Sequence, residues 1–263
     1  MKACREDARL VDLTAVSADC IRLGFDSPEV ASKARPGQFV MLGPLAEDSL
    51  DPFLNRPYSI HRQPQSGRIE LLVARVGRGS QALAELEVGA QVPLLGPLGR
   101  GFSWTAPPAQ ALLLGGGVGV APLFFLAETL ASQGVKVCLV QGAATAARLV
   151  STEELSRSGV EVIVYTDDGS AGLRGLATEG IERCFDERKL DPKLLYMASC
   201  GPTPMLRAFA AWAERQGLSA QLSLENHMAC GTGACMGCSL IMGKDAKRVC
   251  VEGPVFDLEE VVL

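Results

Sequence analysis

The sequence has few histidines, no excess of basic residues and no long apolar run that is free of glycine. His61 and His227 are the only histidines in 263 residues, and no Ser/His/Asp or Cys/His arrangement is apparent. The chain therefore offers no self-contained nucleophilic site. Its net charge is −5, which leaves no long-range attraction for polyanions. We expect neither nucleic acid nor an anionic membrane as a partner.

A hydrophobic leader and an unbroken membrane span are also missing. The first seven residues include Lys2, Arg5, Glu6 and Asp7 and contain no apolar core. Residues 109–127 carry no charge, but four glycines and Pro122 interrupt them. This stretch is typical of a strand, a glycine loop and the start of a helix. We therefore predict a cytoplasmic protein.

Composition and length predict a folded chain of two ordinary domains and a small appendix. Hydrophobic residues make up 48% and charged residues 21% of the chain, close to globular averages. No internal repeat or low-complexity tract is present. The rhythm of apolar runs predicts an α+β multidomain protein with domains at 1–105, 106–222 and 223–263.

The first region predicts a small antiparallel six-stranded β-barrel, because short apolar runs alternate with turn residues. The expected strands are Arg9–Val16, Cys20–Phe25, Gln38–Leu42, Tyr58–His61, Ile69–Val76 and Gln91–Leu95. One helix, Ser80–Leu86, is expected to interrupt them.

Strands alternate with helices in the second region, which predicts a parallel sheet covered on both faces. The expected strands are Gln110–Leu114, Val135–Val140, Val160–Tyr165 and Leu194–Ala198, and the expected helices are Pro122–Gln133, Thr152–Ser158 and Pro204–Gln216. The third region predicts a hairpin of Ser239–Met242 and Lys247–Val251 around a Gly243-Lys244-Asp245 turn.

Four of the nine cysteines fall close together near the end of the chain. The spacing is Cys230-x4-Cys235-x2-Cys238-x11-Cys250, and the x4-x2 opening is that of plant-type ferredoxins. Small residues between the ligands allow a loop to wrap a cluster. The spacing indicates a 2Fe–2S cluster; zinc and unligated buried thiols are the alternatives.

Arg56-Pro57-Tyr58-Ser59 at the start of an expected strand could hold a flavin. Arg56 can pair with a phosphate, Tyr58 offers an aromatic face and Ser59 offers a hydrogen bond. Twenty residues on, Gly79 and Ser80 lead into a helix start, which is suited to a pyrophosphate. Without context these are an ordinary strand and a capped helix.

Three loops at expected strand ends could hold a nicotinamide dinucleotide. A glycine turn containing Gly116, Gly117 and Gly119 opens a helix at Pro122. Such loops lie at the carboxyl edge of the sheet, where ligands bind. The other two loops hold Cys200-Gly201-Pro202 and Asp167-Asp168. Alternatively, the turn is purely structural, Cys200 is an inert buried thiol and the aspartates are a solvated turn.

In this order the motifs resemble the ferredoxin–NADP reductase superfamily. The resemblance covers almost the whole chain and implies a barrel that binds FAD through Arg56–Ser59 and the Gly79–Ser80 loop. It places Cys200-Gly201-Pro202 beside the nicotinamide and lets Asp168 accept a ribose hydroxyl. Residues 141–147, which follow the second expected strand of this region, include no basic residue for a 2′-phosphate, and this favours NAD; Arg148 is the nearest cation.

The order of barrel, nucleotide domain and cysteine lobe is similar to that of the electron-transfer subunit of two-subunit dihydroorotate dehydrogenases. Residues 224–235 and 248–256 resemble that family's cluster loops. The resemblance implies an FMN-containing catalytic partner in a heterotetramer serving pyrimidine biosynthesis, with electrons passing through the cluster and FAD to NAD+. Alternatives are the related subunits of sulfide dehydrogenases, transhydrogenases, hydrogenases and sulfite reductases.

Two further classes stay open on the sequence. One is a zinc-stabilised interaction protein on a degenerate reductase scaffold, which would be colourless. The other is a stand-alone NADH reductase for a diffusible acceptor, which would purify without a catalytic partner.

Overall fold

The computed structural model describes residues 3–43, 51, 53–106, 108–188 and 190–262. The outer residues of the first and third predicted domains, 1–2 and 263, lie outside this part. In the described part, no helix is both long and apolar enough to cross a membrane.

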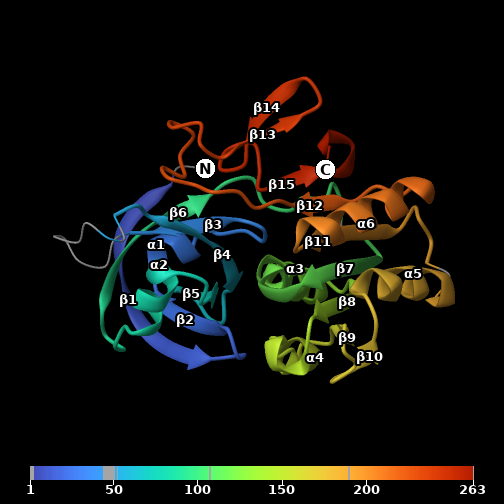
Figure 1. Cartoon of the computed structure of the whole chain (residues 1–263), viewed down its shortest axis with the longest axis horizontal. Coiled ribbons are helices and arrows are strands. Elements are labelled where there is room, and N and C mark those ends of the chain that lie inside the picture. Colours follow the sequence, from blue (N-terminus) through green and yellow to red (C-terminus); the bar gives the residue numbers. More distant parts are fainter. Residues whose placement is uncertain (1–2, 44–50, 52, 107, 189, 263) are drawn as a thin grey trace.

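The N-terminal half forms a closed antiparallel barrel of six strands, which confirms the predicted barrel (Figure 1). The strands are β1 (Cys4–Ala15), β2 (Cys20–Asp26), β3 (Phe39–Leu42), β4 (Arg56–Arg62), β5 (Arg68–Ala74) and β6 (Gln91–Leu98). Around the barrel the order is β1-β2-β5-β4-β3-β6, and β6 pairs again with β1. Large buried side chains such as Phe25, Ile60 and Leu71 fill the interior, and closure leaves no open sheet edge.

Two short helices, α1 (Pro28–Ala31) and α2 (Arg78–Ala84), belong to the barrel half. Helix α2 begins two residues before the predicted helix at Ser80–Leu86, so the predicted start is wrong. Gly77 is the residue before the helix, and the Ser80 hydroxyl accepts a hydrogen bond from the Gly77 N–H at 3.1 Å. The Ser80 side chain therefore caps the N-terminus of α2 from within its first turn, not from the residue that precedes the helix.

The second half contains a seven-stranded sheet in the order β10-β9-β8-β7-β11-β12-β15. Its strands are β7 (Gln110–Gly116), β8 (Lys136–Ala143), β9 (Glu161–Thr166), β10 (Leu173–Arg174), β11 (Leu195–Cys200), β12 (Gln221–Ser223) and β15 (Val255–Asp257). All neighbours are parallel except β12 and β15. The mixed α/β sheet confirms the predicted fold class.

Helices cover both faces of this sheet: α3 (Ala121–Ser132), α4 (Glu153–Arg157), α5 (Ala177–Arg188) and α6 (Thr203–Arg215). On β7, Ala111 and Leu113 share a core with α3, whereas Leu112 and Leu114 share another with α5 and α6. Because successive strand residues face opposite ways, one apolar run fills both cores.

The predicted hairpin exists, but its second strand is two residues early. The strands are β13 (Ser239–Met242) and β14 (Asp245–Arg248), with Met242 paired to Asp245. Gly243 has φ +64°, so Gly243 and Lys244 suffice for a two-residue turn and Asp245 belongs to the strand.

The C-terminal segment lies across the top of both halves in Figure 1. Its β15 pairs with β12 of the large sheet, and its thiols Cys238 and Cys250 share a core with Met41 and Leu98 of the barrel. The predicted boundary after residue 222 falls within β12, and the three domain ranges stay predictions.

Candidate redox site

Strand β4 and the start of α2 bring the two halves of the predicted flavin motif together. A Cβ added at Gly79 would lie 2.7 Å from Cζ of Arg56, so the guanidinium packs directly over this glycine. The half-buried Arg56 also donates a hydrogen bond to the Leu54 carbonyl at 2.6 Å. Only a glycine allows this approach, because any side chain would overlap the arginine.

Tyr58 and Ser59 follow Arg56 on the same strand, paired with Val40 and Phe39 of β3. Both side chains are half-buried. Burial raises the pKa of the Tyr58 phenol, although the charge of Arg56 opposes the shift. Tyr58 therefore keeps its proton at neutral pH and presents a neutral aromatic face. Pro57 lies between Arg56 and Tyr58 and pairs with Met41.

The Ser80 hydroxyl is occupied within its own loop. It accepts hydrogen bonds from the N–H groups of Val76 (3.0 Å) and Gly77 (3.1 Å) and donates to the Gly77 carbonyl at 2.9 Å. The first N–H groups of a helix have no partner within the helix. Backbone groups around Gly79, beside the Arg56 guanidinium, can therefore face an anionic phosphate.

Replacing Arg56 with alanine is expected to weaken FAD binding roughly 10- to 150-fold, because charge-assisted hydrogen bonds contribute about 1.5–3 kcal/mol. The matched control is Arg78→Ala, since Arg78 begins the same helix but is exposed and pairs with Asp51. Titration of flavin-depleted protein with FAD checks this. Equal losses in both variants would contradict a specific role for Arg56.

The glycine turn after β7 packs against the loop after β11. Gly117–Val120 forms a single 3₁₀ turn that leads into α3. A Cβ at Gly119 would lie 2.6 Å from the Gly201 Cα and 2.8 Å from the Cys200 carbonyl carbon. Cys200 is fully buried and pairs with Gly115 across the sheet. Gly116, Gly119, Cys200 and Gly201 therefore meet at one point of the carboxyl edge.

A cavity of about 510 Å³ lies beside this turn, at the carboxyl ends of β7, β8, β9 and β11. Its volume is within the usual range for cofactor sites. Its wall includes Gly116, Gly117 and Pro202 from the predicted site, with Asp19, Cys20 and Ala74 from the barrel. The cavity therefore lies where the two halves face each other.

The cation Arg148 lines this cavity, but Asp19 neutralises it through an ion pair at 3.3 Å. Asp167 adds a second carboxylate to the wall. The cavity wall therefore has more carboxylates than unpaired cations. This charge disfavours the 2′-phosphate of NADP and agrees with the predicted preference for NAD. The sequence could not reveal this pairing because Asp19 belongs to the barrel.

The predicted ribose ligand Asp168 is exposed and engaged locally. Its Oδ1 accepts hydrogen bonds from the Ser170 hydroxyl at 2.6 Å and from the Ser170 N–H at 2.9 Å, and these lower its pKa. Its neighbour Asp167 lines the cavity instead. The role of Asp168 therefore stays a prediction, with Asp167 as a second candidate.

A second cavity of about 570 Å³ lies on the other side of the same turn. Gly116–Gly119 and Gly201 form one wall; Leu240 and Met242 of the hairpin, with Glu225, form the other. Glu225 is an exposed residue in the wall of this cavity, but the protein atoms around its carboxyl partly desolvate it and raise its pKa. Its charge also acts on Cys200, whose pKa is raised first by burial and then by Glu225.

Glu225 was not singled out from the sequence as a site residue, although it directly precedes the cysteine loop. We expect Glu225→Gln to raise the melting temperature at pH 8 by about one degree at most, because solvent around this exposed side chain reduces the cost of its charge. When the pKa of a carboxyl is higher in the folded than in the unfolded protein, the protonated carboxyl favours folding. This contribution to stability is lost as the pH rises through the pKa of the folded state. The two melting curves should converge below about pH 4. Glu259→Gln, which changes another exposed glutamate, is the control. An equal rise in its melting temperature would refute the argument.

The cysteine loop packs against the barrel at Gly231, where an added Cβ would lie 2.5 Å from Met41 Cγ. Backbone N–H groups of Thr232 and Cys235 each donate to the Cys230 sulfur at 3.4 Å. Burial raises the pKa of the Cys230 thiol, but these N–H groups lower it by more, to about 6. A loop whose N–H groups face sulfur suits a thiolate-ligated cluster.

The four predicted ligands differ in exposure: Cys235 is exposed, Cys230 half-buried, and Cys238 and Cys250 buried. Cys250 lies beside Cys238, and burial followed by the Cys238 thiol raises its pKa to about 12. Among the described residues, no three His, Cys, Asp or Glu side chains are already arranged as a metal site. The donor set, four thiols with N–H support, still fits a 2Fe–2S cluster.

Two families of known proteins match parts of this chain. The family described as "Oxidoreductase FAD-binding domain" matches residues 7–102. The family described as "Iron-sulfur cluster binding domain of dihydroorotate dehydrogenase B" matches residues 225–262. The matches coincide with the barrel and with the cysteine lobe.

Relatives cover the chain almost from end to end. The "Dihydroorotate dehydrogenase B (NAD(+)), electron transfer subunit" of Desulforamulus reducens is 34% identical over 261 residues, 97% of each chain. That of Bacillus caldolyticus is 43% identical over 240 residues, 89% of each chain.

Two solved structures are also similar. One described as an NADH-dependent reduced ferredoxin-NADP oxidoreductase is 31% identical, with a TM-score of 0.85 over 98% of this chain and 90% of that one. A ferredoxin reductase of carbazole 1,9a-dioxygenase shares the fold at 24% identity, with a TM-score of 0.69 over 83% of this chain and 67% of that one.

Proposed function

The chain belongs to the family of dihydroorotate dehydrogenase B (NAD(+)) electron transfer subunits, and from this premise we propose how its residues carry electrons. It is a flavin- and iron–sulfur-dependent oxidoreductase subunit that works with a catalytic partner. We propose that this partner contains FMN, oxidises dihydroorotate in pyrimidine biosynthesis, and assembles with this chain as a heterotetramer.

One observation carries the proposal: a single stretch of similarity spans the barrel, the nucleotide domain and the cysteine lobe together. A shared fold alone would support only the reductase superfamily. The cysteine lobe adds to this likeness, because residues 225–262 match the family described as "Iron-sulfur cluster binding domain of dihydroorotate dehydrogenase B".

Each cofactor has its own set of residues. We assign Cys230, Cys235, Cys238 and Cys250 to the cluster; Arg56, Pro57, Tyr58, Ser59, Gly79 and Ser80 to FAD; and Gly116, Gly117, Gly119, Asp168, Cys200, Gly201 and Pro202 to NAD. When bound, the flavin links hydride transfer with nicotinamide to single-electron transfer through the cluster.

The chain's own residues bind and orient the flavin and the nicotinamide. Arg56 neutralises phosphate, and the neutral Tyr58 covers a ring face. The backbones of Gly119 and Gly201 are in direct contact, which holds the glycine turn and the Cys200 loop together at the edge where the nicotinamide would bind. The buried Cys200 thiol stays protonated because burial and Glu225 raise its pKa, so it contributes bulk and a weak donor rather than a nucleophile.

The visible spectrum of anaerobically purified protein, before and after NADH, tests the redox assignment. Flavin bands with cluster absorption between about 400 and 550 nm, and bleaching by NADH, are expected. A colourless protein with bound zinc would overturn the proposal. Co-purification with a subunit that oxidises dihydroorotate, in a complex that reduces NAD+, tests the partner.

A second function is favoured by the 31% identity to the NADH-dependent reduced ferredoxin-NADP oxidoreductase. In that case, the chain would serve a transhydrogenase and pass electrons to a partner that uses NADP. The co-purifying subunit distinguishes the two, since only one of them would couple dihydroorotate to NAD+.

A further inference from the structure

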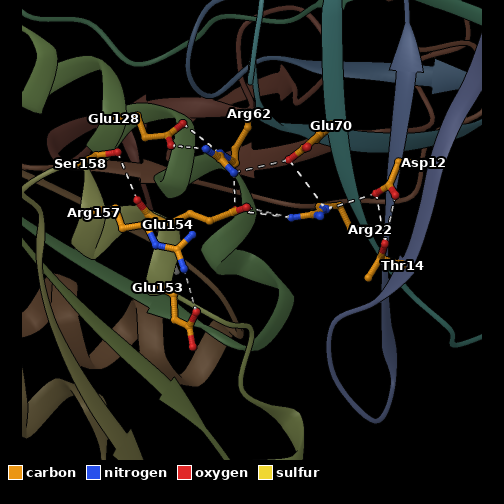
Figure 2. Close-up of polar contacts among 10 residues, drawn as sticks. All are labelled: Asp12, Thr14, Arg22, Arg62, Glu70, Glu128, Glu153, Glu154, Arg157 and Ser158. Atoms are coloured by element: carbon orange, nitrogen blue, oxygen red, sulfur yellow. Dashed lines mark hydrogen bonds and ion pairs between the residues drawn. The ribbon is translucent and has the colours of Figure 1, made fainter.

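Five charged residues connect the barrel with the nucleotide domain, and none of them belongs to a cofactor site assigned above. Arg22, Arg62 and Glu70 lie on β2, β4 and β5 of the barrel, whereas Glu128 and Glu154 lie on α3 and α4. Figure 2 shows their side chains converging between the two halves. We call these five residues the interdomain ion-pair cluster.

Both arginines reach across the interface. Arg62 binds Glu128 with two contacts, Nη2 to Oε1 at 2.7 Å and Nε to Oε2 at 3.1 Å, and it also binds Glu154. Arg22 Nη1 donates to both Glu154 oxygens, at 3.3 and 3.4 Å. Arg62 is only 13% exposed at its side chain, so solvent screens these pairs less than surface pairs.

The same junction is connected to the nicotinamide turn through His61. Its Nδ1 lies 3.3 Å from the carbonyl oxygen of Ala121, the first residue of α3, and its ring packs at a tilt of 46° against the Phe124 ring, with 4.4 Å between the ring centroids. Burial lowers the pKa of His61 to about 3, so the ring is neutral. A register shift between Ile60 and Arg62 places an extra residue in β4, which lets adjacent side chains both contact the nucleotide domain.

Glu70 gives both arginines an alternative partner inside the barrel. Its Oε2 lies 3.8 Å from Arg62 Nη1 and 4.0 Å from Arg22 Nε. Within the described residues, Glu70 Oε2 and Arg22 Nε are buried and have no hydrogen-bond partner, although Arg22 Nε also lies 3.6 Å from Oδ2 of Asp12 (Figure 2). Two unsatisfied buried atoms of opposite type are costly where they stand. They can pair if the arginines withdraw from Glu128 and Glu154.

We propose that the interdomain ion-pair cluster is a two-position device in which the arginines exchange Glu128 and Glu154 for Glu70 as the domains move apart. Its members are positioning residues, and they set how closely the Gly115–Gly119 turn approaches the flavin barrel. The exchange keeps both arginines paired in each position, so opening does not leave a buried charge alone. This inference rests on the proposed flavin-to-nicotinamide reaction.

Glu154→Gln, in the full chain with flavin and cluster bound, tests the closed position. Reduction of the flavin by saturating NADH in a stopped-flow instrument should slow about tenfold, because misplacement of the reacting groups is costly. Reduction by dithionite should not change. Hydrogen exchange should rise in peptides covering 58–62 and 119–125. The matched control is Glu153→Gln, which breaks only the exposed Glu153–Arg157 pair on the same helix (Figure 2).

Glu70→Gln tests the open position. Without the alternative partner the arginines should stay on Glu154 and Glu128, so NADH reduction should not slow and exchange in the same peptides should not rise. Slowing equal to that of Glu154→Gln would overturn the exchange of partners. If hydrogen exchange in these peptides is no faster in Glu154→Gln than in the Glu153→Gln control, the whole two-position proposal is overturned.

Glu128→Gln, which removes a different cross-interface partner, repeats the test if Glu154→Gln does not fold. The exchange readout separates this inference from the proposed function. A wild-type protein whose flavin NADH cannot reduce would refute the function, while the exchange pattern of the variants would still decide about the cluster.

Discussion

Replacing Cys235 with alanine is expected to abolish dihydroorotate-dependent NAD+ reduction by the complex while NADH still reduces the flavin. Cys235 is exposed, so its removal creates no buried void, and the loss reports on ligation rather than folding. Loss of groups that only support metal ligands costs 10–100-fold, so loss of a ligand itself should cost more than about 100-fold.

Two activities are measured in the same preparation: the reduction of NAD+ with dihydroorotate, and the reduction of the flavin by NADH. The visible spectrum should lose its cluster absorption, iron content should fall, and NADH-driven reduction of a dye that accepts electrons from flavin should persist. Cys4→Ala is the control, because the Cys4 thiol is half-buried in β1 and donates to the Gly96 carbonyl at 3.2 Å. A Cys235→Ala protein that retains its cluster would contradict the assignment of this thiol.

Patterns along the chain predicted the elements that depend on local residues. The barrel strands, the glycine turn before α3 and the cysteine spacing all rest on residues near one another in sequence. The missed α5 (Ala177–Arg188) is rich in Glu and Arg. Its buried residues follow the helical period, but two of the four are Ala177 and Gly180, which carry almost no apolar signal. The three-residue strands β12 and β15 are too short to show any period.

Features that depend on distant partners could not be predicted. Arg22 and Glu154 are 132 positions apart, and nothing near either residue indicates the other. Arg148 was seen as a cation close to the nucleotide loop, but its neutralisation by Asp19 needs the barrel. The position of Arg56 over Gly79 could not be predicted either. Taken separately, the Arg56 segment is typical of an ordinary strand and the Gly79 segment of an ordinary helix start.

Conversion of Gly119 to alanine is expected to slow the reduction of the flavin by NADH about 100-fold. An added methyl would lie 2.6 Å from the Gly201 Cα and 2.7 Å from the Gly201 nitrogen. These are backbone atoms, so no rotamer change relieves the overlap, and the two loops must move apart. Displacement of a positioning loop by about 1 Å can cost 10²-fold in rate.

Gly134→Ala is the control for stability. Gly134 follows α3 at φ +82° with no atom near an added Cβ, so its alanine variant has backbone strain of about 1 kcal/mol but no collision. The rate of flavin reduction at saturating NADH should be normal in Gly134→Ala and about 100-fold lower in Gly119→Ala, with flavin and cluster spectra intact in both. If NADH reduces the flavin of Gly119→Ala at the normal rate, the reaction does not depend on the contact between these two loops.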